Sequence, residues 1–121
     1  MYQNDYIMRQ IEMAVRFIVK LLCGEDIPVS EYVCEANFTG DAGELVFALK
    51  EHIRKLELNE AENLLYATLK ENPCQENLKA ALWFYTELGK LSEDKLKMAN
   101  FTHEEILDGL ASLKGMIINY K

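Results

Sequence analysis

The chain has 121 residues, of which half are hydrophobic and 27% are charged, so it is too apolar to be disordered and has room for one domain. Its net charge of −7 argues against nucleic acid as a partner, because proteins bind nucleic acid largely by neutralising phosphates. Only six glycines and two prolines interrupt it, which favours helix over most of its length. We therefore predict a single all-α domain over residues 1–121.

The first predicted helix covers about residues 5–23 and ends before Gly24. At 100° per residue its apolar arc spans roughly 240°. The remaining strip is polar and consists of Arg9, Glu12, Arg16 and Lys20. One neighbouring surface cannot cover such an arc, so the helix should lie centrally in the monomer or be partly buried in a homodimer. We favour a homodimer through this N-terminal helix.

The same region lacks the features of an export signal. Arg16 and Lys20 interrupt its apolar stretch, and the large Leu22 precedes Cys23 where a lipoprotein anchor needs small residues. No other run approaches the ~18 apolar residues that a membrane span requires, so we expect no membrane insertion. We predict a cytoplasmic protein.

Three cysteines, Cys23, Cys34 and Cys74, contain no C-x-x-C pair. Their odd number and spacing are typical of reduced thiols in a cytosolic protein, and we expect them to be small core residues. A metal site would need a fourth ligand and closely spaced pairs, which the sequence does not offer. We therefore expect neither a metal nor a cofactor.

Residues 24–40 contain Gly24, Pro28, Ser30, Asn37 and Gly40 and are predicted to form a connection. One helical turn is possible around residues 30–34. A connection of this length is either functional or wraps the body of the fold. Its apolar side chains favour wrapping, because such residues seek cover.

Helices are predicted next over residues 42–57, 59–71, 76–90 and 103–119, with a short one possible over 92–98. Three starts carry a capping pair, in which an acceptor side chain precedes a carboxylate by three residues. These pairs are Asp41 with Glu44, Asn59 with Glu62, and Thr102 with Glu105. The short links between the second, third and fourth helices require consecutive antiparallel packing.

Residues 42–96 resemble a tetratricopeptide repeat, in which two helices carry small and large apolar residues at fixed positions and a proline closes the second. The matching residues are Leu45, Ala48, Leu49, Ala61, Leu65 and Pro73, and the next unit continues through Leu82, Tyr85 and Gly89. His52 stands where the pattern prefers tyrosine, and Leu49 stands where it prefers a small residue. The resemblance implies a repeat-like helical hairpin.

The whole chain, and above all its opening residues 4–12 (NDYIMRQIE), also resembles an uncharacterised family of small proteins from Gram-positive bacteria. The resemblance implies a bacterial cytosolic origin and a helical fold. It carries over no catalytic or binding residue.

Candidate catalytic groups are sparse, and no linear enzyme motif is present. His103, in the first turn of the last helix, is expected to be exposed rather than a base or metal ligand. His52 shares a helix face with Leu45, Leu49 and Leu56, so we expect it to be packed and hydrogen-bonded. We predict no catalytic residue.

Phe47, Tyr66 and Trp83 lie roughly 100° or more from the centres of their apolar stripes. They are expected either to be covered by other elements, which we favour, or to form a binding surface. Repeat-like geometry would place Lys50, Arg54, Lys79 and Trp83 in a concave groove suited to an acidic or C-terminal peptide.

These features predict a non-enzymatic protein-protein interaction module of the adaptor or regulator kind. Two alternatives stay open. One is a small-ligand-binding helical bundle or an enzyme without a linear motif, which an internal pocket holding His52 and a carboxylate would favour. The other is a first helix that lies on a membrane surface through its apolar arc.

Overall fold

A computed structural model describes the backbone of residues 2–120 and the side chains of residues 6–119, so the side chain of Tyr120, predicted to align with the core, lies outside the described residues. The described chain is built of helices and contains no strand, which confirms the all-α class. The longer helices are α1 (Tyr2–Cys23), α3 (Gly40–Arg54), α4 (Leu58–Glu71), α5 (Gln75–Gly89) and α7 (His103–Tyr120). The short elements are α2 (Val29–Tyr32), the 3₁₀ turn η1 (Glu35–Asn37) and α6 (Glu93–Met98).

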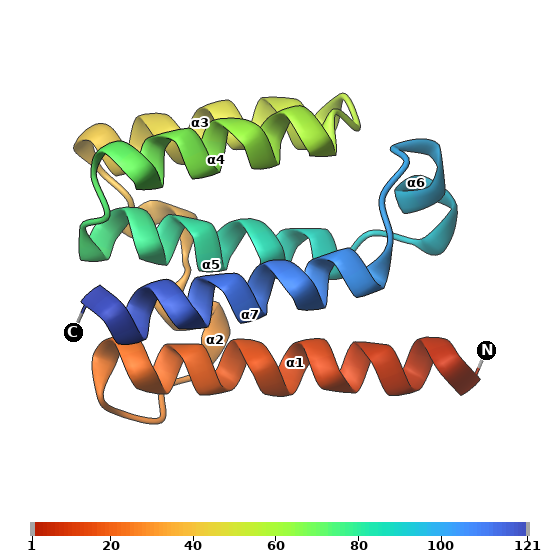
Figure 1. The fold of residues 1–121 in the computed structure, drawn as a ribbon, viewed down its shortest axis with the longest axis horizontal. Coiled ribbons are helices and arrows are strands. Elements are labelled where there is room, and N and C mark those ends of the chain that lie inside the picture. Colours follow the sequence, from red (N-terminus) through yellow and green to blue (C-terminus); the bar gives the residue numbers. More distant parts are fainter. Residues whose placement is uncertain (1, 121) are drawn as a thin grey trace.

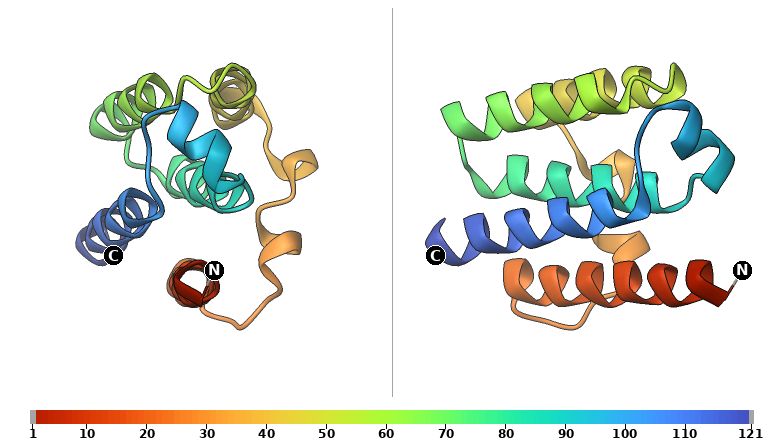
Figure 2. Two further views of the ribbon diagram at one scale, coloured as in Figure 1. Left: turned by 90° about the vertical axis from the view of Figure 1, so that its right-hand side faces the viewer. Right: turned by 45° about the vertical axis from the view of Figure 1, so that its right-hand side comes forward.

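Helices α3, α4 and α5 run antiparallel in succession, as predicted from their short links (Figure 1). Helix α7 then returns along α5, and α1 lies beside α7 and points in the same direction (Figure 1). Viewed end on, α2 and η1 flank α5 on the side opposite α7 (Figure 2). Every longer helix therefore contacts α5, and α5 is the centre of the fold.

The sequence of α5 explains its central place. From Leu78 to Tyr85 only Lys79 is charged, so the helix is apolar on nearly all sides. A helix of this kind is stable only when other elements surround it. Trp83, Phe84 and Tyr85 are among the largest fully buried side chains of the domain.

The first helix is not central, although its wide apolar arc had allowed that arrangement. It contacts α5, α7 and α2, and its inner residues Ile11, Val15 and Ile18 are buried. Its outer side is uncovered in the described chain, where Met13 and Phe17 are exposed. Part of the predicted arc is thus left for some other surface to cover.

Two of the three predicted capping pairs are wrong, and one is confirmed. Helix α3 begins at Gly40 after Thr39, and α4 begins at Leu58 after Glu57, so Asp41 and Asn59 lie inside the first turns. Thr102 does cap α7: the Glu105 amide donates to its Oγ1 at 3.1 Å. The Thr102 hydroxyl in turn donates to the Glu105 carboxylate at 3.3 Å.

Helix α3 also ends earlier than predicted. Leu56 adopts the left-handed conformation with φ of 60°, which stops the helix. The Glu57 amide then donates back to the His52 carbonyl at 2.8 Å, the bond pattern of a Schellman motif. This stop could not be predicted from the residue at position 56, because glycine or asparagine usually holds such a position.

Residues 25–39, hereafter the strap, join α1 to α3 and carry α2 and η1 in place of the single turn predicted at 30–34. Gly24, with φ of 79°, lets the chain turn back after α1. Val33 and Phe38 are buried in the main core. The prediction that this connection wraps the fold is confirmed.

Candidate functional site

The basic residues predicted to line a peptide groove project from α3 and α5 toward the strap. The Lys50 ammonium lies 2.9 Å from the Glu35 carboxylate. The Lys79 ammonium lies 4.8 Å from the centre of the Tyr32 ring and 5.3 Å from that of Phe38. Two of the four predicted groove residues are therefore engaged by the protein's own strap.

The other two predicted groove residues differ in their surroundings. Trp83 is only 2% exposed, beneath α1 and the strap. Arg54 is exposed and pairs with Glu51 of its own helix at 2.9 Å. The prediction of an open groove is corrected: the strap occupies this side of α3 and α5, because Val33 and Phe38 find cover there.

The surroundings of the two histidines match the prediction only in part. His103 is buried rather than exposed, at 8%, and its Nε2 atom has no hydrogen-bond partner among the described residues. His52 is hydrogen-bonded as predicted, with Nδ1 2.9 Å from Glu57 Oε1, but it is only partly buried. Neither histidine lines the cleft between α1, the strap and α5.

The three cysteines are free thiols, but they are not the core residues predicted. Cys34 is exposed on the strap, and Cys23 and Cys74 are half-buried near helix ends. Within residues 6–119, no three His, Cys, Asp or Glu side chains gather as ligands for a metal ion.

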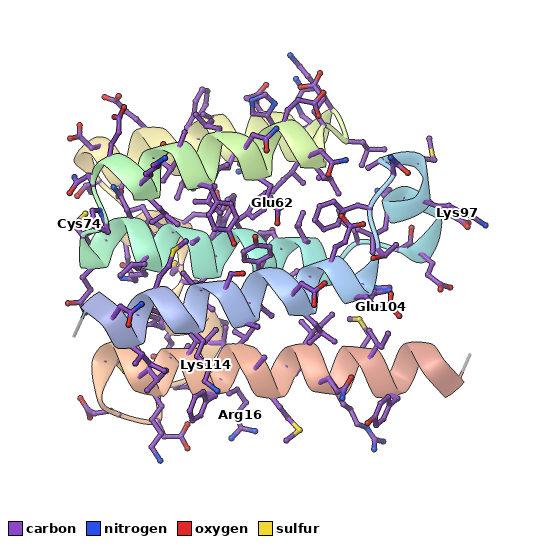
Figure 3. All side chains as sticks on the ribbon, viewed as in Figure 1. Arg16, Glu62, Cys74, Lys97, Glu104 and Lys114 are labelled. Atoms are coloured by element: carbon purple, nitrogen blue, oxygen red, sulfur yellow. The ribbon has the colours of Figure 1, made fainter. Side chains whose placement is uncertain are left out.

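A polar cluster that the sequence did not predict joins α4, α5 and α7. The Tyr85 hydroxyl donates to the Glu62 carboxylate at 2.5 Å and lies 3.0 Å from the Tyr66 hydroxyl. Glu62 points between α4 and α5 (Figure 3). Any Cβ at Gly109 would overlap the Tyr85 ring, so glycine at this position lets α7 approach α5. The cluster ties three helices together.

Burial governs the protonation of this cluster. Burial raises the pKa of Glu62, and the nearby Glu105 carboxylate raises it further, although the hydrogen bond from Tyr85 partly opposes this. Burial also raises the pKa of Tyr85, as do its bonds to Glu62 and Tyr66. The tyrosine is therefore a neutral hydrogen-bond donor rather than a base.

Of the three aromatic residues predicted to lie away from the apolar stripes of their helices, two are covered by other elements and one is exposed. Trp83 is buried, and Tyr66 is half-buried against Tyr85 and α7. Phe47 is 68% exposed on α3, so the expectation that other elements cover it is wrong.

The largest uncovered apolar side chains that occur near one another lie along α1 and the adjoining edge of α7. Tyr6, Met13 and Phe17 of α1 are 64%, 69% and 47% exposed, and Ile118 of α7 is 56% exposed. Spacings of seven and four residues place the α1 members on one side of that helix. The Lys114 ammonium, one turn before Ile118, lies 4.8 Å from the centre of the Phe17 ring and links the two helices.

This surface is basic although the whole chain is acidic. Arg9 and Lys20 flank the apolar row on α1, and neither forms an ion pair within the described residues. Arg16 (Figure 3) lies on the other edge of α1, where it adjoins Asp26 and Val29 of the strap. We refer to the following residues as the α1/α7 face: Tyr6, Arg9, Met13, Phe17, Lys20, Lys114 and Ile118.

Across residues 2–120, no helix combines the length and the apolar character that crossing a membrane requires. The model of a family of unknown function (DUF6483) matches residues 1–117. No curated protein and no solved structure matches the chain. The predicted resemblance to an uncharacterised family is confirmed at this level, and the comparison assigns a role to no residue.

Proposed function

This chain belongs to that family of unknown function, and we propose that it is a non-enzymatic interaction module that binds an acidic, amphipathic helix of a partner protein on its α1/α7 face. The observation that carries the proposal is the exposure of Met13, Phe17 and Ile118 among unpaired cations. Soluble monomers rarely leave large apolar side chains clustered in water unless another surface covers them.

The shape of the face supports a helical ligand. Helices α1 and α7 lie side by side, and Phe17 and Lys114 meet where the two helices adjoin. A third helix can pack against such a pair with apolar residues three and four positions apart. The aromatic Phe17 and the flexible Met13 are residue types that commonly anchor such contacts.

The charge of the face selects among possible occupants. Arg9, Lys20 and Lys114 would attract a partner whose apolar row is flanked by Asp or Glu. A second copy docking through the same face would bring both sets of cations together, because a twofold contact presents identical surfaces to each other. The charge therefore favours an acidic partner over the homodimer first expected from the width of the apolar arc.

The remaining geometry supports a module rather than an enzyme. The described histidines lie apart from the pocket described below, and the carboxyl group of Glu62 is engaged by the Tyr85 hydroxyl. Successive packing of α3, α4 and α5 supports a tetratricopeptide-like scaffold that holds α1 and α7 in place. Reduced thiols and the resemblance to Gram-positive proteins support a bacterial cytoplasmic setting.

The test is an affinity capture from a lysate of the source organism with two charge-reversed variants. Arg9→Glu with Lys20→Glu alters the α1/α7 face, and Lys95→Glu with Lys97→Glu makes the same change in charge on α6. We expect wild type and the α6 variant to retain the same protein, and the α1 variant to lose it. The retained protein should bind through an acidic amphipathic segment.

Other outcomes count against parts of the proposal. If both variants retain the same partner, the face is wrongly assigned. If the α1 variant differs only in losing self-association by analytical ultracentrifugation, the occupant is a second copy. If it differs only in losing affinity for anionic vesicles, the occupant is a membrane surface. If no version retains any protein, the interaction function itself is contradicted.

A further inference from the structure

A separate cleft of about 490 Å³ lies between α1, the strap and the C-terminal half of α5. Its walls are largely apolar, and the side chains that form them come from all three segments. They are Met8, Ile11, Val15, Val29, Val33 and Trp83. The volume falls in the range of small-molecule sites, about 300–1,000 Å³, which are typically concave and apolar with a few polar groups.

The one tryptophan of the chain lacks a hydrogen-bond partner at this cleft. No described group accepts a bond from the Trp83 indole N–H. Within residues 6–119, the only fully buried side-chain nitrogen or oxygen atom without a hydrogen-bond partner is Nε2 of His103. The Trp83 indole nitrogen also lacks a partner, so it is not fully buried and retains some access to solvent. Trp83 is otherwise 98% buried, and a buried indole N–H usually finds an acceptor.

The charges around the cleft mouth cancel. Glu87 is paired with Lys90 at 2.8 Å, and Glu35 is paired with Lys50 outside the cleft. This leaves Glu12 and Arg16, which carry opposite charges one turn apart on α1. The mouth therefore gives no net attraction to an anion or a cation.

We infer that this cleft binds an uncharged, predominantly apolar small molecule that carries a hydrogen-bond acceptor, such as a carbonyl oxygen, which receives the Trp83 indole proton. The apolar walls provide burial, and the indole N–H orients the ligand. The inference does not depend on the proposed protein partner, because the α1/α7 face lies on the outer side of α1 and the cleft on its inner side.

The first test uses the wild-type protein labelled with ¹⁵N. Since the chain has a single tryptophan, its spectrum contains one indole N–H signal, which reports directly on Trp83. The probes are 2-heptanone, which has a carbonyl acceptor, and heptane, which has none. We expect 2-heptanone to move the indole signal downfield in a saturable way, and heptane to leave it without a downfield shift, because only the ketone accepts the indole proton.

A second test separates cleft binding from contact elsewhere. Ser30→Phe places a ring at the mouth of the cleft, and Asn63→Phe adds the same ring on the exposed side of α4. We expect the first variant to lose at least most of the 2-heptanone response and the second to keep it. Circular dichroism checks that both retain the helical content of wild type.

Three results would overturn the inference. The first is an indole signal that does not respond to millimolar 2-heptanone in the wild-type protein. The second is an equal downfield shift of the indole signal with heptane and with 2-heptanone, which would remove the role of the indole N–H. The third is markedly tighter binding of heptanoate or heptylammonium than of 2-heptanone, which would assign the cleft to a charged ligand.

Discussion

Two surfaces of this protein combine cations with aromatic rings, but only one of them is covered by the chain itself. On the side of α3 and α5, the strap supplies Glu35 to Lys50 and two rings to Lys79. On the α1/α7 face, Lys114 meets one ring, that of Phe17. No segment of the described chain crosses that face (Figure 2).

The difference shows that a residue pattern typical of a binding surface does not distinguish an internal contact from an external one. Both surfaces carry basic residues beside aromatic side chains at helical spacing. The strap covers one of them because its 15 residues include Val33 and Phe38, which are buried against the rest of the domain. A surface without such a segment needs a partner from outside.

The largest expected effect is the difference in stability between a variant that lacks the buried Phe38 ring of the strap and one that lacks the exposed Phe17 ring of the α1/α7 face. Phe38→Ala should lower the free energy of unfolding by about 3–5 kcal/mol, because it removes a buried side chain and leaves a cavity. Phe17→Ala should change it by roughly 0.5 kcal/mol or less, because that ring is half exposed. Chemical denaturation followed by circular dichroism measures both. Equal losses of unfolding free energy would mean that the two rings are equally buried, which would contradict the comparison of the two surfaces.

A smaller effect compares the two cation-ring contacts. Lys79→Met keeps the aliphatic stem but removes the charge above Tyr32 and Phe38, and should lower the free energy of unfolding by about 0.5–1 kcal/mol. Lys114→Met should change it less, since the ammonium meets a single ring in water. Denaturant midpoints of the two variants give the comparison. A larger loss for Lys114→Met would contradict the account of the strap.

The smallest expected effect is a pH-dependent change in stability that arises from the partly buried carboxyl group of Glu62. Burial raises the folded-state pKa of Glu62 above its ordinary value of 4.5. The stability that its protonated form provides is therefore full below pH 4.5 and is lost as the pH rises through the raised value. Glu62→Gln, which stays neutral, should gain stability relative to wild type between pH 4.5 and pH 7.

Thermal unfolding of both proteins across that pH range measures the gain. Glu60→Gln, on the exposed side of the same helix, is the matched control. A stability difference between Glu62→Gln and wild type that stays constant from pH 4 to pH 7 would show that burial does not govern this carboxyl group.

Much of the fold followed from the sequence. Apolar periodicity located the longer helices to within about three residues at each end, and the apolar strap residues predicted wrapping. The exceptions have local causes. Leu56 ends α3 in a conformation that leucine rarely adopts, and Asn59, predicted as a cap, instead reaches toward the carbonyls of Ala99 and Asn100.

The candidate site was less predictable, because it depends on which face of each helix is covered. The width of the apolar arc of α1 did indicate a surface in need of cover. Nothing in the sequence indicated that Ile118 and Lys114 of α7 would adjoin it, or that the strap would cover the predicted groove. Those are tertiary contacts between segments about 100 residues apart in one case and 15 to 50 in the other.

The central claim is that the α1/α7 face, rather than any other exposed apolar side chain, contacts a partner. Two exposed phenylalanines provide the comparison, Phe17 on that face and Phe47 on α3. A photo-reactive phenylalanine analogue at each position in turn, irradiated in cells of the source organism, should yield a cross-linked partner at Phe17 and none at Phe47. The same cross-link at both positions, or a cross-link only at Phe47, would contradict the account.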